Sequence, residues 1–261
     1  MEKKEKIAAA EIKTAVAKKD KPKLTPVLTI LEEAIKIWWK NLKKIIMVYL
    51  WGALFALIPV AIVLAVISLN IWVKGNLGLI IASSVIIIAG ILMAAYFLIR
   101  GYMGIFILVK DNYIGKELDI FKATRKLFWP YLGLTVLTSI FILLWTLLLI
   151  IPGIIFSVFY SLACYVFFFE GKKGMAAIRR STELVKNYWW PVFGRFIVVT
   201  IAIWLLMMVV SLPLAGVSED SLFFHFWNIL IQTVNFLVGP IVLLFSYRIY
   251  QDLVKIKKHE A

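Results

Sequence analysis

Six long apolar runs dominate the chain and limit the folds that it can adopt. A helix that crosses a bilayer needs about 20 mostly apolar residues. The runs cover Ile45–Leu69, Leu77–Ile99, Tyr131–Ile151, Ile154–Phe169, Val192–Leu214 and Phe226–Tyr247. Hydrophobic residues make up 62% of the 261 residues, against about 45–50% in soluble domains. The sequence therefore predicts an all-α integral membrane protein with six transmembrane helices, and it excludes soluble, disordered, fibrous and disulfide-stapled classes.

The third and fourth runs are separated only by Pro152-Gly153. This spacing predicts a tight helical hairpin whose turn lies at the far face of the membrane. The run after the turn is the shortest of the six, because it ends before Glu170.

Basic residues are concentrated between alternate runs. Segments 1–44, 110–126, 170–190 and 248–261 hold 26 of the 29 Lys and Arg residues, and the opposite loops hold only Lys74. Basic loops stay in the cytoplasm, so we predict a plasma-membrane protein with both termini cytoplasmic. The net charge of +14 then indicates contact with anionic lipid rather than with nucleic acid.

Composition also predicts the domain limits. Residues 1–24 are basic and are expected to form a disordered cytoplasmic tail, residues 25–250 the membrane domain, and residues 251–261 a short basic tail. Met1–Lys23 lacks the apolar core of a secretory signal, so we expect no cleavage.

Each cytoplasmic segment before an odd-numbered run pairs basic with apolar residues at helical spacing. Before the first run the apolar positions are Leu28, Leu31, Ile35, Trp38 and Leu42. Trp39, Trp129 and Trp190 take equivalent places before the three runs, and Pro130 matches Pro191. Amphipathic helices of this kind lie in the interface plane with Trp at the headgroup level. We predict three cytoplasmic interfacial amphipathic helices anchored by these tryptophans; the alternative is ordinary basic loops.

One region resembles a known family. The residues on which the resemblance rests are Ile151-Pro152-Gly153, Glu170-Gly171, Ala177-Ile178-Arg179-Arg180-Ser181 and Trp189-Trp190. They resemble the membrane domain attached to some glycerophosphoryl diester phosphodiesterases and its stand-alone six-helix relatives of unknown function. The family has Ala-Leu-Arg-Arg-Ser where this chain has Ala-Ile-Arg-Arg-Ser. The resemblance implies the membrane module without the catalytic domain, since the chain has only two histidines, His225 and His259.

Charged residues near the fourth run form a first candidate site. It comprises Glu170, Arg179, Arg180, Ser181 and Arg100. Glu170 and Arg180 are expected to be coupled as a structural ion pair. The alternative is a lipid-headgroup site, because a guanidinium suits phosphate. Arg100 directly follows the second run, whose apolar character resumes as far as Val109. It is therefore expected either to face the bundle, water or an acidic partner, or to extend to the interface.

The sixth run carries a second candidate, a polar helix face. Asn228, Gln232, Asn235 and Ser246 fall on one side of a helix. Amides in lipid need hydrogen-bonding partners, so this face is expected to point into the bundle. It would serve either as contact between helices or as the lining of a solute path.

No catalytic motif, cofactor motif or metal-ligand cluster occurs in the sequence, and Cys164 is its single cysteine. We therefore expect no enzymatic activity, no cofactor and no metal. The leading hypothesis is a multi-pass protein for membrane organisation, lipid handling or support of a partner. Its expected partners are anionic membrane lipids and a membrane protein or a second copy of the chain, not nucleic acid. The alternative is a small-solute transporter or channel that uses the polar face of the sixth run.

Cysteine labelling tests the orientation. In a Cys164→Ser background, Asn76→Cys and Ser218→Cys should react with impermeant maleimide from outside intact cells, because their loops carry almost no basic charge. Lys19→Cys and Lys257→Cys should not react. External labelling at position 257 would show that the C-terminus is not cytoplasmic.

Overall fold

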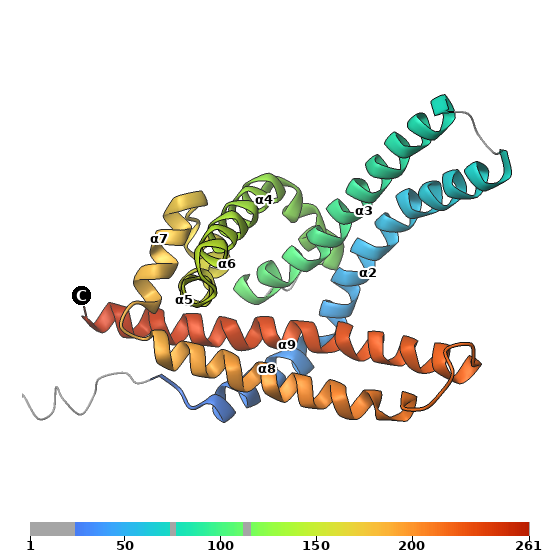
Figure 1. The fold of residues 1–261 in the computed structure, drawn as a ribbon. Helices are drawn as coiled ribbons and strands as arrows, with labels where there is room; N and C mark the ends of the chain where they lie inside the picture. The colour runs from blue at the N-terminus through green and yellow to red at the C-terminus, as the bar shows by residue number, and fades with distance from the viewer. Residues whose placement is uncertain (1–23, 74–76, 112–115, 261) are drawn as a thin grey trace, which may run out of the picture. The chain divides into compact units, whose positions relative to one another are not determined.

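In a computed structural model, the chain is described for residues 24–73, 77–111 and 116–260. The described residues form helices and short turns, with no strand among them. Six of the helical stretches are long and apolar enough to cross a membrane, which confirms the predicted all-α class and its six apolar helices. Residues 1–23 of the predicted tail lie outside the described residues. The elements are α2 (Val27–Val73), α3 (Leu77–Asp111), α4 (Glu117–Leu148), α5 (Ile150–Tyr160), α6 (Ala163–Tyr165), the π-helix η1 (Val166–Glu170), α7 (Gly174–Val185), α8 (Trp189–Ser211), the 3-10 helix η2 (Leu212–Leu214) and α9 (Leu222–Glu260) (Figure 1).

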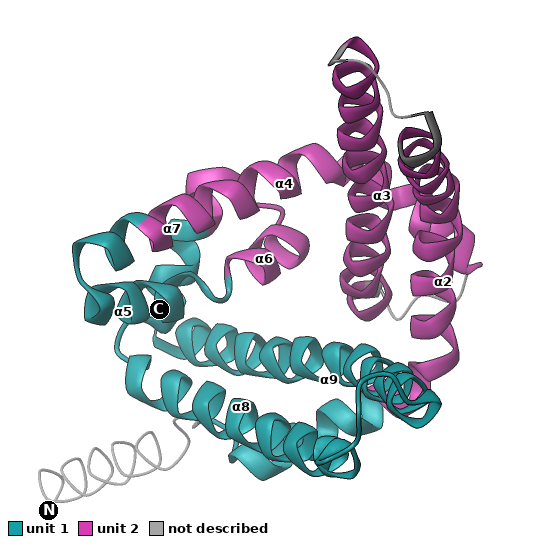
Figure 2. Ribbon diagram, turned by 45° about the vertical axis from the view of Figure 1, so that its right-hand side comes forward, with its two compact units in different colours: residues 1–37, 144–162, 178–261 teal, residues 38–143, 163–177 magenta. Residues whose placement is uncertain are grey.

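The chain folds into two compact units. One contains residues 1–37, 144–162 and 178–261, and the other contains residues 38–143 and 163–177 (Figure 2). The first therefore holds the α8–α9 pair, and the second holds most of the α2–α3 pair.

In the second unit, α2 and α3 form an antiparallel hairpin that is close-packed at its base. A Cβ atom on Gly52 would lie 3.0 Å from the carbonyl oxygen of Phe97 and 3.2 Å from Cα of Gly101. Residues 79–93 of α3 present mostly exposed aliphatic side chains, whereas residues 103–108 are mostly buried. The hairpin thus has an apolar exposed tip and a base packed inside protein.

In the first unit, α8 and α9 form a second hairpin with the same division (Figure 1). Side chains of α9 are mostly exposed or half-buried from Leu222 to Gly239, and many are buried from Pro240 to Ile256. Residues 251–260, predicted as a short basic tail, are the last part of this helix. Leu253 is fully buried there, so the segment contributes to the core of the unit.

A third, shorter hairpin joins α4 to α5. Its turn is at Leu149, which has an extended backbone, rather than at Pro152-Gly153. Pro152 falls in the first turn of α5, where a missing N–H leaves no helical hydrogen bond unmade. Gly153 permits the close approach of the two helices, since a Cβ atom there would lie 2.8 Å from Cα of Thr146.

The predicted interfacial segments differ among themselves. Before the first and third runs they are continuous with the following apolar helix, in α2 and α4. Only α7 is a separate helix, because Asn187 adopts a φ of 74° and ends the helical path before α8. Asparagine tolerates this left-handed conformation better than most residues.

The hairpin between α4 and α5 gives a test of packing. Gly153→Ala should lower the thermal stability of the detergent-solubilised protein, because the new methyl group overlaps the backbone of Thr146; overpacking typically costs about 1–3 kcal/mol. Gly194→Ala is the matched control, since a Cβ atom there has no neighbour within 4 Å. Equal melting temperatures for the two variants would show that the helices are not in this close contact.

Candidate functional site

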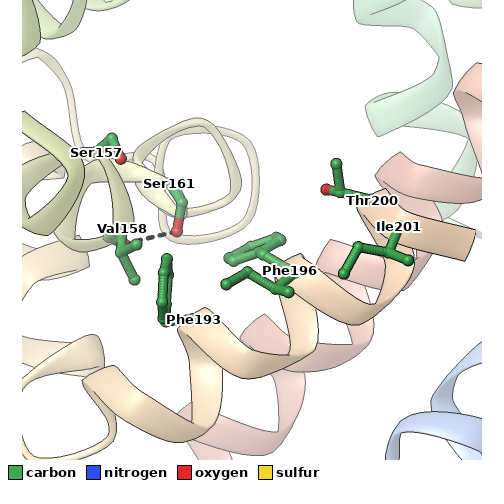
Figure 3. A pocket seen from close by; sticks show the side chains of 8 residues that line it. Ser157, Val158, Ser161, Phe193, Phe196, Thr200 and Ile201 are labelled. Carbon is green, nitrogen blue, oxygen red and sulfur yellow. Dashed lines mark hydrogen bonds between the residues drawn. The ribbon is translucent and has the colours of Figure 1, made fainter. Parts of the chain in front are cut away.

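An apolar groove lies between α5 and α8 in the first unit. It encloses about 370 Å³. Its lining residues are Ser157, Val158, Ser161, Phe193, Phe196, Ile197, Thr200 and Ile201. In Figure 3, Phe193 and Phe196 lie between the α5 side chains and Thr200 on α8. The groove is therefore walled by two helices that are both apolar and partly exposed.

A second cavity of about 460 Å³ continues the groove toward the start of both helices. Phe193 lines both cavities, and Trp189 and Trp190 line the second with Ile151, Ile154 and Ile155. The indole nitrogen of Trp189 donates a hydrogen bond to the carbonyl oxygen of Ile155 at 3.0 Å. From Trp189 to Thr200, α8 rises by about 16 Å, roughly the hydrocarbon thickness of one leaflet.

Two of the hydroxyl groups in the groove are bonded to backbone carbonyl oxygens three residues earlier in the chain. Ser157 Oγ donates to the carbonyl oxygen of Ile154, and Ser161 Oγ donates to that of Val158, both at 2.8 Å. Local bonds of this kind satisfy the hydroxyl groups without a ligand. The α5 wall therefore offers mainly apolar surface, which suits a hydrocarbon chain.

Arg100 is the buried cation of the second unit. Its Nε donates to Thr124 Oγ1 at 3.0 Å, and Nη2 donates to the carbonyl oxygen of Phe121 at 2.7 Å. A third bond joins Nη1 to the hydroxyl of Tyr96 at 3.3 Å, and the guanidinium lies 4.2 Å from the ring centroid of Phe121. None of these partners is an acid. Only 6% of the residue is exposed, so in this structure Arg100 neither pairs with a carboxylate nor extends to the surface.

The residues of the predicted cluster around Glu170 belong to both compact units. Glu170 lies in the second unit, with its carboxylate 3.4 Å from Nζ of Lys172. Arg180 lies in the first unit, where its guanidinium is 3.3 Å from Glu183, and Arg179 is exposed. The coupling of Glu170 with Arg180 therefore stays a prediction.

Ser181 has a specific structural role. The residue is fully buried, and its Oγ donates to the carbonyl oxygen of Phe159 at 2.6 Å. The same atom accepts a hydrogen bond from the backbone N–H of Leu162 at 3.2 Å. Both backbone groups flank the break between α5 and α6. Ser181 thus replaces helical hydrogen bonds that the break removes.

The predicted polar face of α9 is also divided. Gln232 and Asn235 are exposed, Asn228 is half-buried and Ser246 is buried. Asn235 and Ser246 each donate to a backbone carbonyl of their own helix, at 3.2 and 2.9 Å. Gln232 and Asn235 are thus exposed within their own unit, and the expectation that the whole face points into the bundle stays a prediction. The exposed pair lies toward the apolar tip of the hairpin, where packing against the rest of its unit is sparse.

Sequence reasoning missed a polar cluster at the start of α2. The backbone N–H of Thr25 donates to Asp252 Oδ2 at 3.0 Å, and its carbonyl oxygen accepts from Arg195 Nη2 at 2.7 Å. Arg248 forms an ion pair with Glu33 at 2.9 Å. These contacts tie the start of α2 to α8 and α9. The sequence signal for these contacts is the pair Arg248 and Asp252. The two residues lie one helical turn apart at the end of an apolar run.

The three predicted anchors are all exposed. Trp39, Trp129 and Trp190 have exposed fractions of 70%, 73% and 74%. Near the third anchor, the hydroxyl of Tyr188 donates to Glu260 at 3.0 Å. This bond favours the neutral phenol and raises the pKa of Tyr188 above its ordinary value.

Within residues 24–260, apart from the gaps given above, no group of three or more His, Cys, Asp or Glu side chains is arranged to hold a metal ion. The described residues offer apolar grooves, the buried Arg100 and exposed aromatic residues. No protein-family model, curated protein or solved structure matches the chain.

The hydrogen bonds of Arg100 can be tested by substitution. Arg100→Gln should lower thermal stability, since it leaves buried polar groups unpaired at a cost of about 1–3 kcal/mol. Thr124→Val should do the same, and the double variant should lose less than the sum of the two losses. Arg179→Gln is the exposed control and should change little. A loss for Arg100→Gln no larger than that of the control would contradict the assigned contacts.

Proposed function

We propose that this protein is a non-catalytic, multi-pass membrane protein that binds membrane lipid and thereby organises the membrane or supports a partner. The observation that carries the proposal is the groove between α5 and α8. Its continuous apolar lining runs from Trp189 to Thr200. We further propose the plasma membrane as its location, with both termini in the cytoplasm, on the distribution of basic residues.

Hydrocarbon is the occupant that the chemistry of the groove favours. Ile197 and Ile201, which line the groove on α8, are exposed aliphatic side chains. Exposed apolar area of this extent is unfavourable in water at roughly 25 cal/mol per Å². An acyl chain of one leaflet would cover the groove over its whole length.

Preference for anionic headgroups is supported by the first part of α2. One side of this helix exposes Leu28, Ile35 and Trp39. Lys36, Lys40 and Lys43 are exposed beside that side, whereas the opposite side holds the fully buried Ile30 and Ala34. A helix with protein on one flank, apolar residues on another and cations between them suits the membrane surface. Each cation near anionic lipid contributes about 1 kcal/mol.

The resemblance of residues 151–190 to the membrane domain of certain phosphodiesterases agrees with a membrane role but adds no activity. The hydroxyl of the motif residue Ser181 is already hydrogen-bonded to the backbone of Phe159 and Leu162. Arg179 is the exposed cation of that motif and is the one free to approach a headgroup.

A transporter or channel is the second candidate. The observation in its favour is the exposure of Gln232 and Asn235 on an apolar helix. Because these amides lie on the outside of their unit, a solute path would need further protein surface beside them. Solute flux into proteoliposomes would separate this candidate from lipid binding.

Filling the groove tests the lipid proposal. Thr200→Trp should remove at least one retained lipid from the purified protein in native mass spectrometry, because the indole would occupy the cavity. Leu205→Trp places the same side chain on the exposed surface of α8 outside the groove and should leave lipid retention unchanged. With mixed vesicles, the retained lipid should be enriched in the anionic component. Identical retention by both variants would argue against a groove-bound lipid.

A further inference from the structure

We propose that the second unit contains a binding site for a lipophilic organic cation, formed by an apolar cavity along α2 and the carboxylate of Glu117 at the start of α4. All the residues of the site fall within 38–143, which belong to that unit (Figure 2). The ligand has the opposite charge to the anionic lipids proposed above. The site is independent of the groove between α5 and α8, which lies in the first unit.

The cavity has the size of a small-molecule site. It encloses about 520 Å³, within the range of about 300–1,000 Å³ that such sites occupy. Six of its lining residues come from α2, namely Met47, Leu50, Trp51, Ala53, Leu54 and Leu57. The three leucines are 51%, 52% and 60% exposed, so the cavity is open at the surface. This wall offers apolar area to a hydrocarbon or aromatic group.

Glu117 supplies the charge of the cavity. Of the described residues that line it, only Glu117 is charged, and its side chain is half-buried. Its carboxylate forms no ion pair with another described residue. Asp119, in the same helical turn, lies 3.8 Å from Nζ of Lys122. A half-buried carboxylate without a paired cation, beside apolar surface, favours a positively charged ligand.

The local structure of α4 suits a carboxylate at this place. Glu117 lies in the first turn of the helix, where the helix dipole favours a negative charge. Lys116, its neighbour in the chain, is exposed and does not line the cavity. The charge that the ligand meets is therefore that of Glu117.

Stacked aromatic rings hold the two walls of the cavity together. Trp51, which lines the cavity, stacks on Phe55 with ring centroids 5.8 Å apart. Phe55 stacks in turn on Phe121 at 5.4 Å, and Phe121 follows Glu117 by one helical turn. The stack thus fixes Glu117 beside α2 before a ligand binds, which lowers the cost of binding. An indole ring also attracts cations that lie within about 6 Å of its centroid.

Charge complementarity determines the occupant. The net charge of +14 gives the chain a field that attracts anions and repels cations, and this cavity has the opposite local charge. Glu117 would repel the phosphate of an anionic lipid, and an acyl chain alone would leave the carboxylate unpaired. A ligand that carries one positive centre among apolar groups satisfies both the carboxylate and the leucines.

Binding of tetraphenylphosphonium tests the proposal. The full-length protein in nanodiscs of neutral lipid is titrated with this cation, and empty nanodiscs correct for partitioning into lipid. Saturable binding is expected. Glu117→Gln should weaken it about tenfold, because a contact between opposite charges is lost. Glu183→Gln removes an exposed acid from α7 with the same change in net charge, and it should keep the wild-type affinity.

Two further comparisons locate the bound cation. Ala53→Leu narrows the cavity and should weaken binding, whereas Ala82→Leu adds the same bulk to an exposed position of α3 outside the cavity and should not. Tetraphenylborate, an anion of the same shape, is titrated separately. Its affinity should not fall in Glu117→Gln or in Ala53→Leu, because an anion is repelled from this site.

Several results would overturn the proposal. They are absence of saturable cation binding to the wild-type protein, wild-type affinity for the cation in Glu117→Gln, and an equal loss of cation and anion binding in Ala53→Leu. If Glu117→Gln does not yield monodisperse protein, Ala53→Leu and Ala82→Leu decide, and equal affinities for the cation reject the site. Loss of groove-bound lipid in Thr200→Trp leaves these titrations unchanged, so this inference and the lipid proposal fail independently.

Discussion

Hydrocarbon accepts apolar side chains but offers no partner to a polar backbone group or a charge, and the organisation of the hairpins follows from this constraint. In α3, exposed aliphatic residues give way to a buried base at Arg100. In α9 the same change occurs at Pro240. Each tip is helical and satisfies its own backbone, so it can lie in lipid. Each base is packed with side chains from its own unit.

The two arginines inside apolar runs illustrate how cations are accommodated at these bases. Arg100 binds a hydroxyl, a backbone carbonyl and two aromatic residues. Arg195 binds the carbonyl oxygens of Pro191 and Thr25. Guanidinium groups suit this use because their five donors point in fixed directions. Each arginine thus joins segments that are distant in the sequence.

The exposed tryptophans and the buried Ser181 show that similar sequence signals had different structural outcomes. Trp39, Trp129 and Trp190 were expected at the interface, and each is exposed. Ser181, beside two arginines, could have faced a headgroup. Its hydroxyl instead bonds to the backbone at the break between α5 and α6. The difference lies in spacing: Ser181 shares one side of α7 with the buried Ile178 and Leu184. An isolated motif does not reveal which of its residues belong to that side.

The sequence by itself determined the all-α class, the six apolar helices and the asymmetry of basic charge, because these depend on local composition and on helical length. The contacts of Arg100 with Phe121 and of Thr25 with Asp252 were decided by the tertiary structure. The second pair is separated by 227 residues, and no local pattern encodes such a pairing.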